Sequence, residues 1–375
     1  MIPIIDIFAG PGGLGEGFSS LLNENGERIF KIKLSIEKDP YAHQTLKLRS
    51  FFREFNVGHV PEDYYAFVRG EITIDQLYSK FPEQAASADL EACCGTLGDP
   101  DEGDTNGMTN EEVDNRIQNS LGDHTNWVLI GGPPCQAYSL VGRSRRQERI
   151  LNEANDKRVG LYKEYLRIIA VHNPAVFVME NVKGLLSAKT EDVLIFSKIL
   201  EDLSDPVTAC ISEGEVLDNN QPHFRYRIYS LTRVPDNYDL YGNPVFNPND
   251  FIIKSEEYGI PQKRHRVILL GIREGIPAPE NNLERLDEVS LSSVIGNLPD
   301  IRSGITREFT HFTMEIDEKG KSKKKRHYRK IDDSFQIWST HMEEFNSQIN
   351  NILGIEQGRL LTFPETLGAE FLPVI

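Results

Sequence analysis

The sequence lacks several features that would assign it to common classes of protein. It has no run of about eighteen apolar residues, so no membrane-spanning helix is predicted. No basic stretch of a secretory signal precedes the apolar residues of Met1–Ile7, which are typical of a buried strand. The four cysteines show no Cys-x-x-Cys spacing, which argues against a zinc site and against a disulfide framework. These absences predict a reducing, intracellular setting and no bound metal.

Positive charge is also scarce, with 41 Lys and Arg against 57 Asp and Glu and a net charge of −16. Such a balance argues against nonspecific adhesion to nucleic acid, which usually requires a basic surface. The charge is unevenly distributed, however. Residues 143–146 and 321–330 are strongly basic, whereas residues 99–123 are acidic. A local basic surface on an acidic protein therefore stays open.

The first 274 residues alternate between strand-like and helix-like patterns. Strands are expected at 2–7, 30–37, 90–98, 127–130, 175–179 and 266–271, and helices at 15–22, 41–52, 161–171 and 193–203. This alternation predicts an α/β fold with a Rossmann-like, doubly wound, mostly parallel sheet. Ligands of such sheets bind beyond the carboxyl ends of the strands. Three polar segments are predicted to follow strands there, at 6–13, 131–136 and 180–181.

Two stretches interrupt the alternation, and a third ends it. Residues 53–123 are too long for an ordinary connection and look like an insertion, and residues 209–250 look like an additional β excursion. The pattern stops near Glu274. We therefore expect one large domain over 1–274 and a smaller C-terminal region over 275–375.

A glycine-rich turn follows the first predicted strand. Gly10, Gly12 and Gly13 come directly after Asp6 at the strand end, and glycines there let the backbone approach a cofactor closely. About 24 residues later, Glu37 ends the second strand, where a carboxylate can accept hydrogen bonds from both ribose hydroxyls. An ordinary tight turn with a solvated glutamate is the alternative.

Two further strand ends carry groups suited to acid–base or nucleophilic chemistry. Cys135 follows a proline pair after the strand at 127–130, and attack by its sulfur would require the thiolate form. A proline-rich turn with an incidental cysteine explains the same pattern equally well. Glu180 ends the strand at 175–179 and could be a structural cap or a general acid whose pKa rises on burial.

Three long side chains with N–H donor groups lie at the start of the last predicted strand. Gln262, Arg264 and Arg266 alternate along the chain, so in an extended segment their side chains would project from one face. Fork-shaped donors on one face suit a nucleobase or a phosphate. Taken alone, a solvated basic strand start is the simpler interpretation.

Taken together, the order and separation of these segments resemble the DNA cytosine-5 methyltransferase family over residues 1–273. The resemblance implies a fold of the S-adenosylmethionine-dependent methyltransferase type. It implies that S-adenosylmethionine is bound by Asp6, Phe8, Gly10, Gly12, Gly13, Glu37, Pro134 and Leu161, with Phe8 stacked on the adenine. It implies the catalytic residues Cys135, Glu180, Arg264 and Arg266, and the substrate-binding residues Gln136, Asn181 and Gln262.

The resemblance also implies a mechanism. The Cys135 thiolate would add to C6 of a cytosine flipped out of duplex DNA, and C5 would then accept the methyl group. Glu180 would bind N3 and the exocyclic amine, while Arg266 would donate to O2 with support from Arg264. Such a protein would belong to the bacterial cytoplasm, associated with the nucleoid, and to a restriction–modification system.

Past residue 273 the pattern departs from the family. Residues 275–375 would be a partial target-recognition region, in which 321–330 either meets phosphates or forms a solvated loop. Residues 359–365 resemble a later motif only faintly, and the Asn-rich final motif is absent. This predicts a divergent or truncated C-terminal part, with a second chain as one possible source of the motif. The acid near the adenine stays open between Asp99 and Asp114.

Three other functions compete with this interpretation. A tRNA cytosine-5 methyltransferase would use the same catalytic set. A catalytically silent fragment would need a partner chain. A Rossmann-type oxidoreductase is the weakest, because it explains neither the Pro-Pro-Cys loop nor the donors of 262–266.

Overall fold

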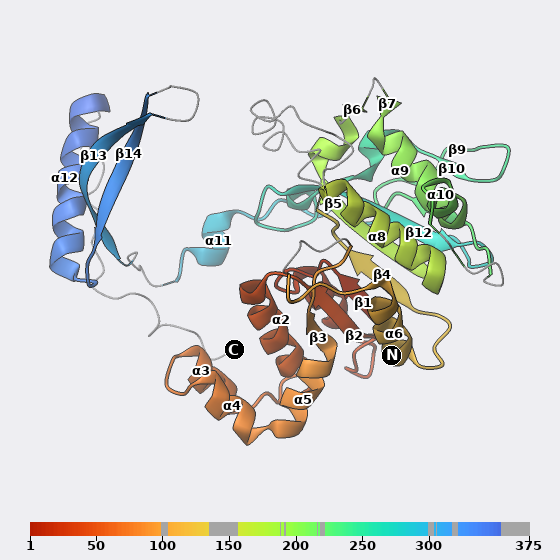
Figure 1. Ribbon diagram of the computed structural model, residues 1–375, viewed down its shortest axis with the longest axis horizontal. Helices are drawn as coiled ribbons and strands as arrows, with labels where there is room; N and C mark the ends of the chain where they lie inside the picture. Colours follow the sequence, from red (N-terminus) through yellow and green to blue (C-terminus); the bar gives the residue numbers. More distant parts are fainter. Residues whose placement is uncertain are drawn as a thin grey trace. The chain divides into compact units, whose positions relative to one another are not determined.

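A computed structural model describes residues 1–98, 104–134, 157–187, 189–190, 193–215, 217, 222–298, 304, 306–316 and 322–353 (Figure 1). The chain divides into two compact units. The first comprises residues 1–60 and 78–294, and the second comprises residues 61–77 and 295–375. The predicted site residues all belong to the first unit.

An eight-stranded sheet forms the centre of the first unit, in the order β11-β12-β5-β4-β1-β2-β3, with β8 also paired to β12. The parallel strands are β1 (Ile2–Ile7), β2 (Phe30–Glu37), β3 (Ala92–Cys94), β4 (Val128–Gly131) and β5 (Val176–Val182). The remaining strands, β8 (Tyr226–Tyr229), β11 (Ile252–Lys254) and β12 (His265–Arg273), extend the sheet beyond β5 by antiparallel pairing. The predicted doubly wound, mostly parallel sheet is confirmed.

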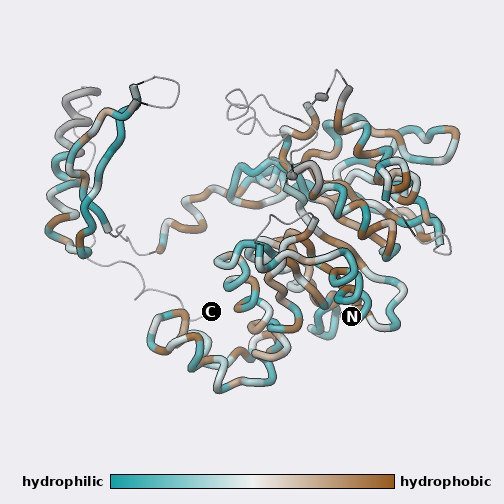
Figure 2. The backbone as a smooth tube through the Cα atoms, in the orientation of Figure 1, coloured by the Kyte–Doolittle hydropathy of each residue, from teal (hydrophilic) through white to brown (hydrophobic). Residues whose placement is uncertain are grey.

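Helices follow the parallel strands and bury both faces of the sheet. They are α1 (Gly13–Ser19), α2 (Pro40–Arg53), α5 (Pro82–Glu91), α6 (Asn110–Leu121), α8 (Lys157–His172), α9 (Ile195–Ser204) and α10 (Pro206–Ser212). Alternate residues of β1 enter different cores, because successive strand side chains point to opposite faces. Ile5 and Ile7 pack in a large core with residues of α6, α8 and α9, whereas Ile4 packs in a smaller one beside Leu14 and Phe18. Figure 2 shows the hydrophobic residues gathered along these strands.

The interval predicted as an insertion, 53–123, contains a strand of the sheet itself. It begins with α3 (Glu62–Val68) and α4 (Ile74–Lys80), but β3 then pairs in parallel with β2. The strand predicted over 90–98 is shorter than expected, because Leu90 and Glu91 complete α5. The last part of the interval, α6, packs in the large core.

The predicted β excursion over 209–250 is also narrower. Its first residues finish α10, whose N-terminus is capped by Asp205 accepting from the Thr208 amide. The β structure starts only at β8 and continues with the short strands β9 (Asn237–Tyr238) and β10 (Pro244–Val245). Short elements complete the unit: η2 (Lys183–Ser187), β6 (Lys189–Thr190), β7 (Val193–Leu194), η3 (Pro248–Phe251) and η4 (Ser255–Glu257).

The second unit contains the strongly basic residues 322–330. β13 (Arg307–Ile316) and β14 (Ser322–Lys330) form an antiparallel hairpin, followed by α12 (Phe335–Leu353). The solvated-loop alternative for residues 322–330 was therefore wrong. The short helix α11 (Leu291–Ile295) reaches the boundary between the units. No helix in the described parts of the chain is long and apolar enough to cross a membrane.

Candidate active site

The glycine-rich turn after β1 is held by its own backbone and by Glu37. Phe8 has φ of 57°, Gly10 of 57° and Gly12 of 85°, so three residues of the turn lie in the left-handed region that favours glycine. The Gly10 amide donates to Glu37 Oε2 at 2.8 Å, and the Asp39 amide donates to Oε1 at 2.8 Å. Glu37 is thereby fixed at the carboxyl end of β2. Its remaining lone pairs are suited to accept from ribose hydroxyls.

Asp6 lies beneath this turn and is buried. Residue exposure is 1%, and a Cβ added to Gly15 of α1 would come within 3.0 Å of Asp6 Oδ2. Burial raises the pKa of Asp6 to about 8, against the opposing influence of Arg53. With almost no surface of its own, Asp6 can contribute to a cofactor site only through the position of the turn and of α1.

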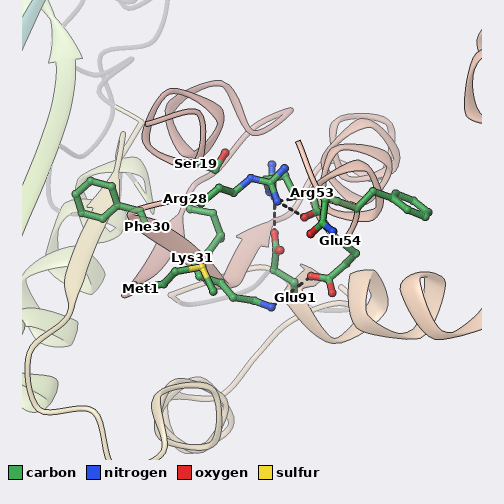
Figure 3. A pocket seen from close by; sticks show the side chains of 11 residues that line it. Met1, Ser19, Arg28, Phe30, Lys31, Arg53, Glu54 and Glu91 are labelled. Carbon is green, nitrogen blue, oxygen red and sulfur yellow. Dashed lines mark hydrogen bonds and ion pairs between the residues drawn. The ribbon is translucent and has the colours of Figure 1, made fainter. Parts of the chain in front are cut away.

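A buried ion-pair cluster, which the sequence did not reveal, joins helices α1, α2 and α5 (Figure 3). Arg53, at the end of α2, pairs with Glu16 of α1 at 3.0 Å and with Glu91 of α5 at 2.5 Å. Arg28 donates to the Arg53 carbonyl oxygen at 2.5 Å. The cavity drawn in Figure 3 is lined by Met1, which precedes β1, and by Phe30, which begins β2, so it lies at the amino edge of the sheet, away from the turn.

The loop after β4 passes directly against Glu180. A Cβ on Gly131 would come within 2.5 Å of the Ile7 carbonyl oxygen, and one on Gly132 within 3.2 Å of Glu180 Oε2. Only glycine permits these two approaches without displacement. Pro134 is half-buried at the end of this loop, and Cys135 and Gln136, which follow it, lie outside the described residues.

Asn181 connects that loop to β5. Its side chain is buried, Nδ2 donates to the Pro133 carbonyl oxygen at 3.4 Å, and Oδ1 accepts from the Val182 amide at 2.8 Å. The structure thus places Asn181 under the proline loop. We take it as a residue that positions the loop, in addition to the substrate role expected from the sequence.

Antiparallel pairing brings the arginines to Glu180. Arg266 pairs with Val182 and Ile268 with Glu180, so the start of β12 lies at the carboxyl end of β5. Glu180 Oε1 lies 2.7 Å from Arg266 Nε and 3.9 Å from Arg264 Nη2. The closer contact is an ion pair whose N–H is not aligned for a hydrogen bond. Three of the four predicted catalytic side chains therefore meet, and each keeps solvent-exposed surface for a ligand.

The donor segment is less regular than predicted. The extended strand starts only at His265, and Gln262 lies in an exposed turn where its amide donates to the Ile260 carbonyl oxygen at 2.7 Å. Gln262 and Arg264 both precede the strand, so the three donors do not share one strand face. The alternation rule failed because it holds only for extended backbone.

Residues of η4 anchor the same segment and were missed by the sequence analysis. Ser255 donates to the Arg264 carbonyl oxygen from its amide at 3.2 Å and from Oγ at 2.7 Å. Glu256 Oε1 lies 2.7 Å from His265 Nε2. In the sequence, Ser255 and Glu256 are two polar residues a few positions before Gln262, and such pairs are common on surfaces.

Leu161 lies at the carboxyl end of β3. Its Cδ2 would be 3.4 Å from a Cβ on Gly98, a residue that follows that strand.

Asp114 lies in α6 and pairs with Arg167 at 2.9 Å and with His172 at 2.8 Å, both on α8. It is therefore engaged in joining two helices, whereas Asp99 lies outside the described residues.

Comparison with known proteins identifies the family. The model of the C-5 cytosine-specific DNA methylase family matches residues 104–207 and 246–361, more than half of the chain. The match includes the loop after β4, Glu180 and both arginines, and it extends past residue 273, where the recognisable motifs end. It is incompatible with the oxidoreductase alternative.

Individual relatives agree with this match. The chain is 30% identical over 292 residues to the type II methyltransferase M.Bpa9945I of Bacillus paralicheniformis, covering 75% of this chain and 56% of that protein. It is 24% identical to M.DdeI of Desulfomicrobium norvegicum, covering 80% and 49%. It is 27% identical to M.AquIA of Picosynechococcus, covering 72% of each chain. The chain thus spans about half the length of the first two relatives. The match of the family model over more than half of the chain shows that it belongs to the C-5 cytosine-specific DNA methylase family.

Proposed function

We propose that this chain transfers a methyl group from S-adenosylmethionine to C5 of a cytosine in duplex DNA, as part of a type II restriction–modification system. The observation that carries the proposal is the meeting of Glu180, Arg266 and Arg264 against the glycine–proline loop that leads into Cys135. The relatives are named as type II methyltransferases, which supports the finer assignment.

The residues present fit the proposed cofactor. Glu37 offers carboxylate lone pairs at the end of β2, the turn of Phe8 to Gly13 offers close backbone approach, and Leu161 offers an apolar side chain beyond β3. When bound, S-adenosylmethionine supplies an electrophilic methyl group on its sulfonium sulfur. The side chains of this protein then have to make C5 of cytosine nucleophilic.

Cys135 and Glu180 share that task in the proposed mechanism. The Cys135 thiolate forms a bond to C6, and Glu180 holds a proton at N3 so that the electrons of the 5,6 double bond move to C5. Arg266 donates to O2, where negative charge builds, and its ion pair with Glu180 sets the angle of both groups. After C5 accepts the methyl group, a base removes the C5 proton. The C6–sulfur bond then breaks and returns its electrons to the thiolate.

A base inside a stacked duplex cannot be reached by these groups, so the cytosine has to be flipped out. We propose that residues 275–375 form the target-recognition region that holds the surrounding DNA, and residues 1–274 the catalytic domain.

Trapping with 5-fluorocytosine tests the proposal. Duplex DNA carrying this base should form a covalent adduct with the protein in the presence of S-adenosylmethionine, because fluorine cannot leave as a proton would. Cys135→Ser should form none. Cys210→Ser is the matched control, since burial raises the pKa of the Cys210 thiol to about 12 and removes it from chemistry.

Tritium transfer from labelled cofactor separates the substrates. Label is expected in duplex DNA, and label in tRNA alone would replace this proposal with the tRNA alternative. A folded chain that forms no adduct and transfers no label would instead be a silent fragment.

A further inference from the structure

The hairpin of the second unit has two chemically different faces, and a single extra residue creates them. Phe309 pairs with Tyr328 and Phe312 with Arg326, although the phenylalanines are three residues apart. A shift of register between Phe309 and His311 leaves Thr310 as an unpaired bulge residue. Residues three apart on a regular strand would point to opposite faces, so the bulge is what brings both phenylalanines to one side.

We call this side the aromatic face and define it by six residues: Arg307, Phe309, Phe312, Lys324, Arg326 and Tyr328. Its rings are solvent-exposed, with Phe309 at 44%, Phe312 at 42% and Tyr328 at 43%. The cations lie over the rings: Lys324 Nζ is 3.8 Å from the Phe312 ring centre, and Arg307 is 4.7 Å from that of Tyr328. Exposed cations suit contact with phosphates, and exposed rings offer apolar surface for base edges such as the thymine methyl group in the major groove.

The opposite face carries two carboxylates that pair with two of its three cations. Glu308 pairs with Arg329, and Glu315 lies 2.7 Å from Lys325 Nζ. The rings of His311 and His327 stack with their centres 4.8 Å apart. By contrast, within the described part of the chain no carboxylate lies within 4 Å of the cations of the aromatic face. The aromatic face therefore has the larger excess of positive charge, since two carboxylates offset three cations on the opposite face.

We infer that the aromatic face binds duplex DNA, with the two-stranded ribbon seated in the major groove. This inference rests on the proposed function for the identity of the nucleic acid. The major groove of B-form DNA admits a two-stranded β-ribbon, whereas that of an A-form RNA helix is too narrow. A second copy of this acidic chain is disfavoured as the occupant, because pairing two such faces would oppose cation to cation.

Two double variants of the full chain test the assignment, because neighbouring residues of one strand point to opposite faces. Lys324→Ala/Arg326→Ala removes two cations from the aromatic face, and Lys323→Ala/Lys325→Ala removes two from the other face. Fluorescence anisotropy would measure binding to a labelled duplex at several salt concentrations. The first variant should bind about ten-fold or more weakly, and its slope of log affinity against log salt should fall by about two. The control should change affinity less than about three-fold.

Deletion of Thr310 adds a variant with no change in charge. It places Phe309 two residues before Phe312 on a regular strand, so both rings stay on the aromatic face and affinity should change less than about three-fold. Circular dichroism and the melting temperature would show that the variants fold. Equal losses in the two double variants, or equal binding of duplex RNA of the same sequence, would overturn the inference.

Binding and methyl transfer are measured separately, so the two proposals can fail separately. Face-dependent DNA binding without methyl transfer or a Cys135 adduct would leave this inference standing and reject the proposed function. Methyl transfer to DNA with affinity unchanged by Lys324→Ala/Arg326→Ala would reject this inference alone.

Discussion

The two halves of the sheet's carboxyl edge are built by different means. At β1 and β2 the backbone forms the site, since amides of the glycine turn and of Asp39 donate to Glu37 and left-handed residues shape the turn. At β5 and β12 charged side chains form it, with Glu180 between Arg264 and Arg266. The first half therefore depends on the space that glycines leave, and the second on the pairing of partly exposed charged side chains. Substitutions should separate these two dependences.

The largest effect is expected in the charged half. Glu180→Gln keeps the shape of the side chain but removes the carboxylate partner of Arg266, which is also the acid that we propose holds a proton at N3. We expect methyl transfer to fall by about 10³-fold, or roughly 4 kcal/mol of transition-state stabilisation, with DNA affinity changed much less. Single-turnover tritium transfer measures this. Glu213→Gln, which breaks a surface pair with Lys163, should keep its rate.

Where β4 packs against β1 of the backbone half, a single added methyl group should destabilise the fold. Gly131→Ala places a Cβ within 2.5 Å of the Ile7 carbonyl oxygen, and backbone cannot move aside cheaply. The free energy of unfolding should fall by about 1–3 kcal/mol in urea titration. Gly17→Ala is the control, because its Cβ would meet nothing within 4 Å and alanine favours the helix. A Gly131→Ala protein as stable as the wild type would show that the loop is not constrained by close packing.

A buried carboxyl group beneath the turn, that of Asp6, should make the backbone half sensitive to pH. Burial raises the pKa of Asp6 to about 8, whereas an unfolded aspartate titrates near about 4. The folded protein therefore holds a proton that the unfolded chain releases, and stability decreases from pH 4 toward pH 8 by up to about 1.4 kcal/mol per unit. Asp6→Asn removes this loss.

The melting temperature of Asp6→Asn should thus exceed that of the wild type at pH 8.5, with a difference that shrinks toward pH 5. Asp123→Asn, at an exposed position, should track the wild type throughout. A constant difference between Asp6→Asn and the wild type across this range would mean that Asp6 is ionised at all these pH values.

The smallest effect is expected from the anchor of the arginine segment. Ser255→Ala removes the Oγ donor to the Arg264 carbonyl oxygen but leaves the amide donor. We expect a three- to ten-fold loss in kcat, about 1 kcal/mol, with little change in KM or stability. Ser255→Thr should restore most of the rate. A loss confined to KM would assign Ser255 to DNA binding instead.

The sequence predicted those parts of the fold that depend on local pattern. Apolar periodicity located the strands and helices of the sheet, and the strand-end rule grouped Glu37 and Glu180 at one edge. It could not predict that β12 runs antiparallel to β5, because strand direction is set by the long connection between them. The roles of Cys135 and Gln136 stay predictions, since both lie outside the described residues.

Contacts between distant helices were beyond prediction. Arg53 ends α2 and Glu91 ends α5, and each looks like an ordinary solvated helix terminus in the sequence. Their burial follows from the approach of α1, α2 and α5, which no local pattern encodes. Asp114 shows the converse, because its spacing from Cys135 suggested the cofactor site while packing committed it to α8.

The antiparallel junction of β5 and β12 has a consequence for how this protein can change. Seven consecutive residue pairs hold the junction in register, so the position of Arg266 relative to Glu180 does not depend on the chain between them. The entropy of closing a loop grows only slowly with its length. The exposed stretch 239–241, between β9 and β10, can therefore lengthen or accept an inserted domain at small thermodynamic cost. An insertion of one residue within β12 would turn the arginine to the opposite face.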